Sequence, residues 1–158
     1  MMEPAPIHFR DAKHGDLPQL LALYRHLVAD DELPPPDVAS SVLDHFLRYE
    51  GSAIFVGETC GQLVVSCTLV VVPNLTRGGS PYGFIENVVT HGDFRKRGFG
   101  KHILNHATTA AWDAGCYKVM LLTGSRNPAT LNFYLEAGFE QSKTGFQRRR
   151  IPIRPEAS

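Results

Sequence analysis

The feature that most constrains this chain is a basic segment with two glycines, which joins an expected strand to the start of an expected helix. It spans residues 91–101 and reads HGDFRKRGFGK. The helix over residues 98–114 carries apolar side chains on one face and is stopped by Gly115. Backbone N–H groups at a helix start are unpaired and lie at the positive end of the helix dipole. Gly98 and Gly100 leave that main chain open, so the segment predicts a site for an anion such as a pyrophosphate.

The spacing of these glycines excludes two common nucleotide-binding motifs. The GxxxxGK[ST] loop is absent, and the third glycine of a GxGxxG fingerprint is replaced by Ile103. A glycine pair alone is weak evidence, because a cationic and solvated helix start would have the same pattern.

Hydrophobic patterns along the rest of the chain predict strands interspersed with helices. We expect three further helices: one that begins after Asp16, one that is closed by Gly51, and one at residues 127–137. We expect strands at residues 7–10, 53–56, 63–72, 82–90, 118–122, 139–141 and 146–151. This order predicts an α/β protein of the mixed-sheet, α+β kind, with helices packed on the sheet. Because there is no visible repeat or linker, residues 1–158 are expected to form a single domain.

Charge argues against two classes of partner. The 16 Lys and Arg residues balance 16 Asp and Glu residues, which disfavours a protein built to coat nucleic acid or an anionic membrane. The balance is uneven along the chain. Residues 1–50 hold 9 acidic and 4 basic side chains, a net charge of −5, whereas residues 51–158 hold 7 and 12, a net charge of +5.

The cysteines, the histidines and the first residues indicate a cytoplasmic protein without a metal. Three widely spaced cysteines with no CxxC pair predict free thiols. His102 and His106 have the spacing of two zinc ligands, but the glutamate of an HExxH motif is missing and no third ligand is evident. The N-terminus has neither a basic flank nor an apolar stretch, so we expect no signal peptide, and no segment is long enough to span a bilayer.

Two motifs give the chain a resemblance to the GNAT superfamily of N-acetyltransferases. Arg95-x-x-Gly98-x-Gly100 is similar to the family's Arg/Gln-x-x-Gly-x-Gly/Ala motif, and residues 127–139 resemble its Asn…Phe-Tyr-x-x-x-Gly-Phe segment. The order of the expected elements resembles the family over nearly the whole chain. The resemblance implies a mostly antiparallel sheet of about seven strands, splayed between strands 4 and 5 and flanked by about four helices. It also implies an enzyme with acetyl-CoA as co-substrate, no metal, and a possible homodimer.

The resemblance assigns a set of residues to the cofactor. In that family the glycine motif binds the pyrophosphate of acetyl-CoA, and the pantetheine lies along the fourth strand. The residues expected to bind it here are Val88, Val89, Thr90, Arg95, Lys96, Arg97, Gly98, Phe99, Gly100, Lys101, Asn127 and Phe133. Two of these assignments have a second interpretation, since the valines also fit a core and Asn127 also fits a helix cap.

Tyr134 and Glu86 are the expected catalytic residues. Tyr134 resembles the family's tyrosine that protonates the departing CoA thiolate, although a core tyrosine with its hydroxyl at the surface would fit the same helix. Glu86 is a carboxylate within an otherwise apolar strand. It is either the base that deprotonates the amine, directly or through water, or an outward-facing residue paired with a neighbouring base.

The acceptor is expected to be a primary amine on a small molecule, attacking directly in a ternary complex, with no nucleic acid or membrane as partner. Residues 85–87 resemble the Ile-Glu-Asp segment of glucosamine-6-phosphate N-acetyltransferases, but Asn87 stands where that branch has aspartate. Asn87 and the acidic Asp30, Asp31 and Glu32 are the residues expected to contact the substrate. Two alternatives stay open: a protein or peptide N-acetyltransferase, and a non-catalytic CoA-binding sensor or interaction module.

Overall fold

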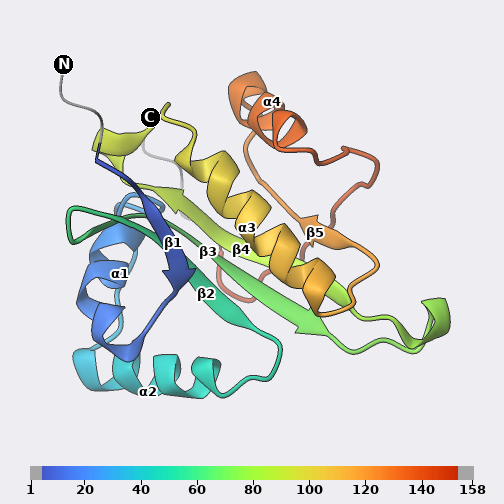
Figure 1. Cartoon of the computed structure of the whole chain (residues 1–158), viewed down its shortest axis with the longest axis horizontal. Helices are drawn as coiled ribbons and strands as arrows, with labels where there is room; N and C mark the ends of the chain where they lie inside the picture. Colours follow the sequence, from blue (N-terminus) through green and yellow to red (C-terminus); the bar gives the residue numbers. More distant parts are fainter. Residues whose placement is uncertain (1–4, 153–158) are drawn as a thin grey trace.

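A five-stranded mixed sheet forms the centre of the protein, whose computed structural model describes residues 5–152 (Figure 1). The strands lie in the order in which they occur along the chain: β1 (His8–Asp11), β2 (Ala53–Thr59), β3 (Gln62–Val72), β4 (Tyr82–Thr90) and β5 (Val119–Leu121). The first four pair antiparallel, and β5 pairs parallel with β4. The β2–β3 turn is tight because Cys60 and Gly61 both have positive φ, at 49° and 75°.

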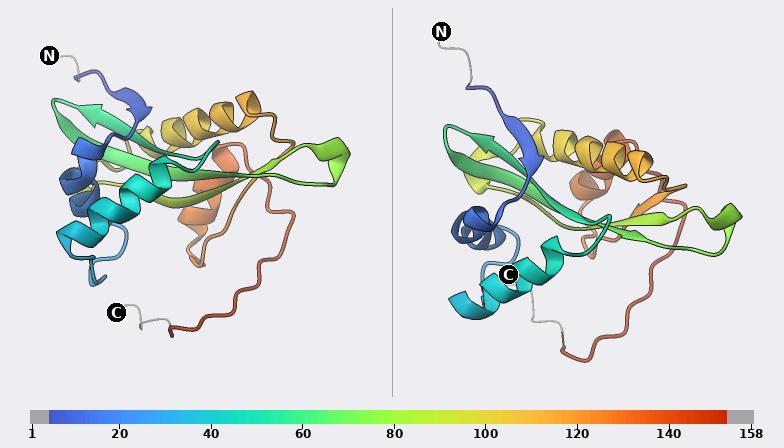
Figure 2. Two further views of the ribbon diagram at one scale, coloured as in Figure 1. Left: turned by 90° about the horizontal axis from the view of Figure 1, so that it is seen from below. Right: turned by 60° about the horizontal axis from the view of Figure 1, so that its bottom comes forward.

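Helices cover both faces of this sheet, and each face has its own core. The helices are α1 (Leu17–Tyr24), α2 (Pro36–Leu47), α3 (Phe99–Asp113) and α4 (Pro128–Glu136). Figure 2 shows α1 and α2 against one face of the sheet and α3 against the other. One core joins Leu20, Leu23 and Leu43 of α1 and α2 to the sheet, and the other lies beneath α3. Burial on both sides explains why β3 reads as a nearly continuous apolar run.

Strand β4 leaves β5 partway along its length. The parallel pairing joins only Gly83, Phe84 and Ile85 to β5, whereas the pairing with β3 continues to Thr90. Between these regions Asn87 adopts a left-handed conformation with φ 53°, and the β3–β4 register shifts. The extra residue is a β-bulge on β4, which bends the strand away from its neighbour. The last part of β4, Val88–Thr90, therefore has β3 alone beside it.

The prediction of about seven strands is wrong, because the described chain has five. The two expected strands at residues 139–141 and 146–151 are not formed, and no strand or helix follows α4 up to residue 152. This segment lies almost entirely at the surface, with Phe146 91% exposed and Ile151 66% exposed. A strand is stable only when its main chain pairs and one face is buried, and this polar, basic segment has neither within the described chain.

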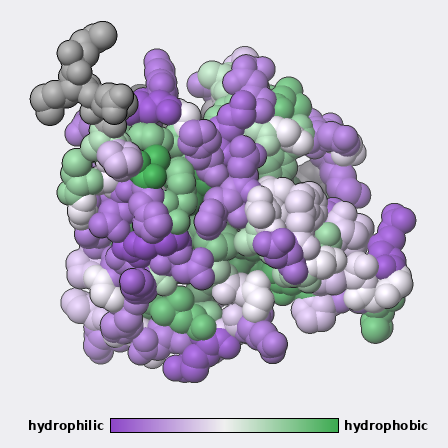
Figure 3. All heavy atoms as spheres, in the orientation of Figure 1, coloured by the Kyte–Doolittle hydropathy of each residue, from purple (hydrophilic) through white to green (hydrophobic). Residues whose placement is uncertain are grey.

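The long hairpin formed by β3 and β4 extends beyond the helices (Figures 1 and 2). Figure 3 shows a small apolar spot at its otherwise polar tip, and Leu75 in that tip is completely exposed. Within residues 5–152, none of the helices has both the length and the apolar character needed to cross a membrane.

Candidate acetyl-CoA site

The glycine loop forms the start of α3 and presents its positive end to solvent. A short 3-10 turn, η3 (Gly92–Phe94), begins the loop, and Gly98 caps α3 with φ 82°. Arg95 is oriented by main-chain carbonyls, with Nε donating to Thr90 O at 3.3 Å and Nη2 to His26 O at 3.1 Å. Arg97 Nη2 donates to Asp93 O at 3.0 Å. The loop therefore combines unpaired helix N–H groups with exposed cations, an arrangement suited to a polyanion.

A cavity of about 590 Å³ lies beside this loop, between the end of α1, the last part of β4 and α4. Most of the residues expected to bind the cofactor line it: Val88, Val89, Thr90, Arg95, Lys96, Gly98, Phe99, Gly100, Lys101 and Phe133. Tyr134 lines it as well. Two expected residues do not: Arg97 and Asn127, whose side chain instead caps α4 by accepting from Ala129 N at 3.0 Å. The cavity runs from the basic loop along the part of β4 that has left β5.

Helix α4 brings an aromatic pair to this cavity. Phe133 and Tyr134 have ring centroids 5.0 Å apart in an edge-to-face arrangement, and both pack against the core beneath α3. Phe133 lies so close to Gly100 that a Cβ at that glycine would be 3.0 Å from its ring. Burial, followed by the nearby Cys67 and Glu86, raises the pKa of the Tyr134 hydroxyl. Tyr134 is therefore protonated at neutral pH and is available as a proton donor.

Glu86 lies on the other face of the sheet. It pairs in register with Thr68, which pairs in turn with Ile54, a member of the core beneath α1 and α2. Residues directly opposite each other on neighbouring strands point to the same face, so the Glu86 side chain projects towards the side of α1 and α2. After the bulge at Asn87, Val88 packs against the core beneath α3, and Val89 is buried in the core beneath α1. Val89 is therefore a core residue that also lines the cavity.

Comparisons with known proteins identify the family. A model of the acetyltransferase (GNAT) family matches residues 20–139, which is most of the chain. The chain belongs to the acetyltransferase (GNAT) family. A glucosamine 6-phosphate N-acetyltransferase of Trypanosoma brucei brucei is 30% identical over 141 residues, covering 88% of this chain and 92% of the relative. A probable glucosamine 6-phosphate N-acetyltransferase 2 of Oryza sativa subsp. japonica is 28% identical over 75% of this chain and 72% of its own.

A solved structure supports the same assignment for the fold. The structure of a putative acetyltransferase from Agrobacterium tumefaciens str. C58 is 48% identical, covers 90% of this chain and 99% of its own, and has a TM-score of 0.87. The resemblance predicted from the two motifs is therefore confirmed. As a GNAT member the protein is an acetyl-CoA-dependent N-acetyltransferase, with acetyl-CoA as its co-substrate.

In this GNAT member, several residues around the cavity were not expected from sequence. They are His26, Leu27, Phe94, Ala129, Thr130 and Glu136. His26 and Leu27 lie in the turn that follows α1, far from the glycine loop in sequence, and no local motif marks them. The expected substrate residues Asp30, Asp31 and Glu32 lie in the exposed segment between α1 and α2, and they do not line the cavity. Asn87 forms the bulge but also lies outside the cavity lining.

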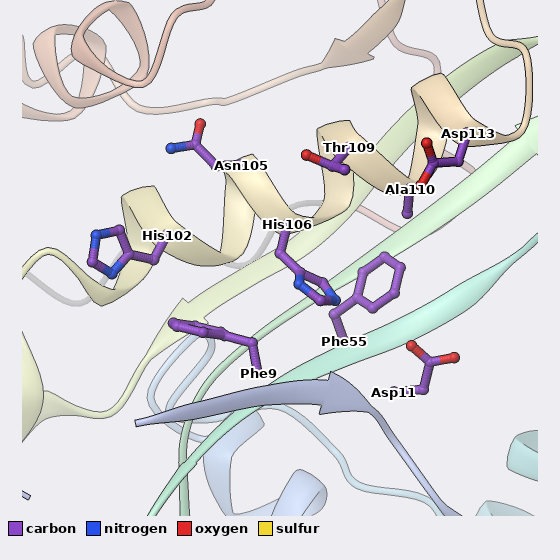
Figure 4. Close-up of a pocket in the computed structure, with 9 residues that line it drawn as sticks. All are labelled: Phe9, Asp11, Phe55, His102, Asn105, His106, Thr109, Ala110 and Asp113. Atoms are coloured by element: carbon purple, nitrogen blue, oxygen red, sulfur yellow. The ribbon is translucent and has the colours of Figure 1, made fainter. Parts of the chain in front are cut away.

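A second cavity, of about 600 Å³, lies on the other flank of α3, between that helix and strands β1 and β2 (Figure 4). His106 stacks on Phe9 with centroids 6.2 Å apart and meets Phe55 edge-on at 4.9 Å, and His102 meets Phe9 edge-on. The two histidines therefore contact aromatic rings. Across residues 5–152 there is no group of three or more His, Cys, Asp or Glu side chains that could hold a metal ion.

Replacement of Gly100 by alanine is expected to weaken the binding of acetyl-CoA. The new methyl group would lie 3.0 Å from Phe133 and 3.5 Å from Thr90 Oγ1, so the ring must move within the cavity lining. Overpacking of this kind costs about 1–3 kcal/mol, and we expect Kd to rise about tenfold in isothermal titration calorimetry. Gly15→Ala is the control, because no atom lies within 4 Å of the added carbon. An unchanged Kd for Gly100→Ala would show that the Gly100–Phe133 contact does not shape the site.

Proposed function

We propose that this acetyltransferase acetylates a primary amine on a small molecule by direct attack in a ternary complex. The observation that carries the proposal is the placement of two proton-handling groups where β4 leaves β5. Tyr134 packs beneath α3 and lines the cavity, while Glu86 projects from the opposite face of β4. The two are near enough for the Glu86 carboxylate to contribute to the raised pKa of Tyr134. An amine that approaches from the side of α1 and α2 would therefore meet acetyl-CoA held along β4.

Each group has one proton to handle in such a reaction. Glu86, directly or through water, takes the proton that the amine loses as its nitrogen forms a bond to the thioester carbonyl carbon. Tyr134 gives its hydroxyl proton to the sulfur as the carbon–sulfur bond breaks. The residues proposed to hold acetyl-CoA are the cavity-lining members of the loop and β4 and Phe133 of α4, together with Arg97 and Asn127, which do not line the cavity. The resulting products are an amide and the free thiol of CoA.

The acceptor proposed is a small molecule that carries an ammonium group, which reacts as the uncharged amine. The names of the curated relatives make glucosamine 6-phosphate the first compound to test. Asp30, Asp31 and Glu32 are proposed to attract the cationic form, and Asn87 to contact the acceptor at the bulge. A protein or peptide amine is the alternative acceptor, and a CoA-binding module without turnover is the alternative of another class.

We further propose that residues 1–158 act as one domain in the cytoplasm. The family model spans elements from α1 to the end of α4, and the two cores share one sheet. Cys60, Cys67 and Cys116 are free thiols, as a reducing compartment would keep them. Limited proteolysis of the intact chain would yield a stable fragment smaller than this unit if the single-domain proposal were wrong.

Turnover with a panel of amines tests the proposed function. Release of the CoA thiol from acetyl-CoA is followed with glucosamine 6-phosphate, polyamines, aminoglycosides and peptides with free amino groups. We expect at least one small-molecule amine to exceed the amine-free blank and the peptides not to do so. Turnover with peptides alone would favour the alternative acceptor. Binding of acetyl-CoA without turnover by any amine would favour the sensor.

The two catalytic assignments predict different pH behaviour. Tyr134→Phe is expected to lower kcat about 100-fold or more, since general acid catalysis contributes about 10²–10⁴. Because burial raises the pKa of Tyr134 above its usual value of about 10, the native enzyme should keep its acid form throughout the neutral range. Glu86→Gln should lose a similar factor near neutral pH. Its deficit should shrink as pH rises, because solvent then deprotonates the amine.

Steady-state rates with the best amine, measured from neutral to alkaline pH, check both assignments. Tyr82→Phe is the control, because that tyrosine lies in β4 outside the cavity lining. Full activity of Tyr134→Phe at every pH would exclude it as the acid. A deficit of Glu86→Gln that stays constant with pH would exclude the carboxylate as the base.

We also propose that two copies assemble through their C-terminal segments. In residues 5–152, β5 is the last strand of the sheet, and the segment after α4 has no strand partner. The segment passes beside the end of β5, where a Cβ at Gly145 would lie 2.8 Å from Leu122, and it then exposes Phe146 and Ile151. An open edge and an unpaired extended segment in one molecule are complementary between two copies.

Light scattering after size exclusion is expected to give the mass of a dimer. Phe146→Glu combined with Ile151→Glu should shift it to a monomer, because charge would replace apolar contacts at the proposed interface. Leu75→Glu is the matched control, since Leu75 is fully exposed at the hairpin tip. A monomeric native chain, or a dimer that both sets of changes leave intact, would contradict the proposal.

A further inference from the structure

His26 connects the end of α1 to the first turn of the glycine loop. Its ring atom Nδ1 accepts a hydrogen bond from Gly92 N at 3.1 Å, across 66 residues of sequence. Its carbonyl oxygen accepts from Arg95 Nη2 at 3.1 Å. One residue thus contacts both the start of the loop and the cation that the family motif places at the pyrophosphate. His26 also lines the cavity.

A second histidine repeats this arrangement within the loop. His91 Nδ1 accepts from Asp93 N at 3.1 Å, and the His26 and His91 rings lie with centroids 4.0 Å apart. The two histidines therefore satisfy consecutive N–H groups at the start of η3, which a short 3-10 turn leaves without partners. A backbone N–H can only donate, so each Nδ1 must carry a lone pair, which an imidazolium lacks.

We propose that His26 is a positioning residue for the acetyl-CoA site, which holds Gly92 and Arg95 in place and makes acetyl-CoA affinity fall at acid pH. The proposal rests on the proposed role of the glycine loop as the acetyl-CoA site. His26 acts through the loop, in that protonation of its ring converts the acceptor for Gly92 into a donor. The loop then loses the hydrogen bond that fixes its first turn.

The charges around His26 set the direction of this response. Burial and then the neighbouring His91 and Arg95 lower the pKa of His26 below its usual value of about 6.5, against an opposing contribution from Asp93. His26 is therefore neutral at neutral pH, and its hydrogen bond from Gly92 is intact there. As pH falls through the lowered pKa, the neutral fraction decreases, and the apparent affinity decreases with that fraction.

Asparagine at position 26 separates hydrogen bonding from titration. Its Oδ1 stands the same number of bonds from Cα as the Nδ1 of histidine, so it can accept from Gly92 N at any pH. Alanine removes the acceptor altogether. The experiment titrates the full-length native chain, His26→Asn and His26→Ala with acetyl-CoA by calorimetry, at about pH 7.5 and about pH 5.5.

At the higher pH we expect His26→Asn to bind within about twofold of the native chain and His26→Ala about fivefold more weakly, the usual effect of one lost hydrogen bond. At the lower pH the native chain should lose more affinity than His26→Asn does, because only histidine loses its acceptor on protonation. The asparagine variant corrects for any pH effect on acetyl-CoA itself and on the rest of the protein. With a turnover assay, His26→Ala should raise KM for acetyl-CoA and leave kcat within about twofold.

Three results would overturn the proposal: native affinity for His26→Ala, failure of asparagine to restore binding, or equal pH responses of the native chain and His26→Asn. These are distinct from failure of the proposed function. If the native chain binds no acetyl-CoA, or binds it with an affinity that Arg95→Ala leaves unchanged, the glycine loop is not the acetyl-CoA site. In that case the proposed acetyl-CoA site, on which the role of His26 depends, is wrong.

Discussion

The functional part of this structure depends on one departure from regular sheet pairing, the separation of β4 from β5 after Ile85. Asn87 has a left-handed backbone and lies in a bulge that gives β4 one extra residue. Beyond the bulge the last part of β4 leaves β5, while β4 stays paired with β3 as far as Thr90. The chain then passes through η3 and the glycine loop to the start of α3, which lines the same cavity as the end of β4. Asparagine is among the residues that tolerate this conformation best, so a short polar side chain at the bulge is physically explained.

The bulge also lies where the two proposed catalytic residues are divided between the two faces of the sheet. Glu86, just before it, belongs with the core beneath α1 and α2, and Tyr134 belongs with the core beneath α3. In the proposed reaction, this separation would let Glu86 meet the amine and Tyr134 meet the departing sulfur.

Local patterns predicted the parts of this fold whose stability is local. The start of α3 at Gly98, its stop at Gly115 and the Asn127 cap of α4 all follow from residue preferences within a single turn. Residues 146–151 were wrongly predicted as a strand, because strand formation depends on a partner edge that local sequence does not specify. His26 was missed for a related reason, since its partner Gly92 lies 66 residues away and a single histidine at a helix end has no distinctive pattern.

The basic side chains of the glycine loop, which contribute to the positive half of the sequence, are held by main-chain groups near the end of α1. Arg95 and Arg97 are oriented by the carbonyl oxygens of Thr90, His26 and Asp93, which are main-chain groups. A carboxylate would hold a guanidinium equally well but would cancel its charge, whereas a carbonyl fixes its direction and leaves a full positive charge for a ligand. The ion pairs of Arg10 with Asp16 and Glu58 contrast with this, since they neutralise a cation that only ties β1 to its neighbours. The loop is therefore ordered without being neutralised, which suits its proposed role in binding a polyanionic co-substrate.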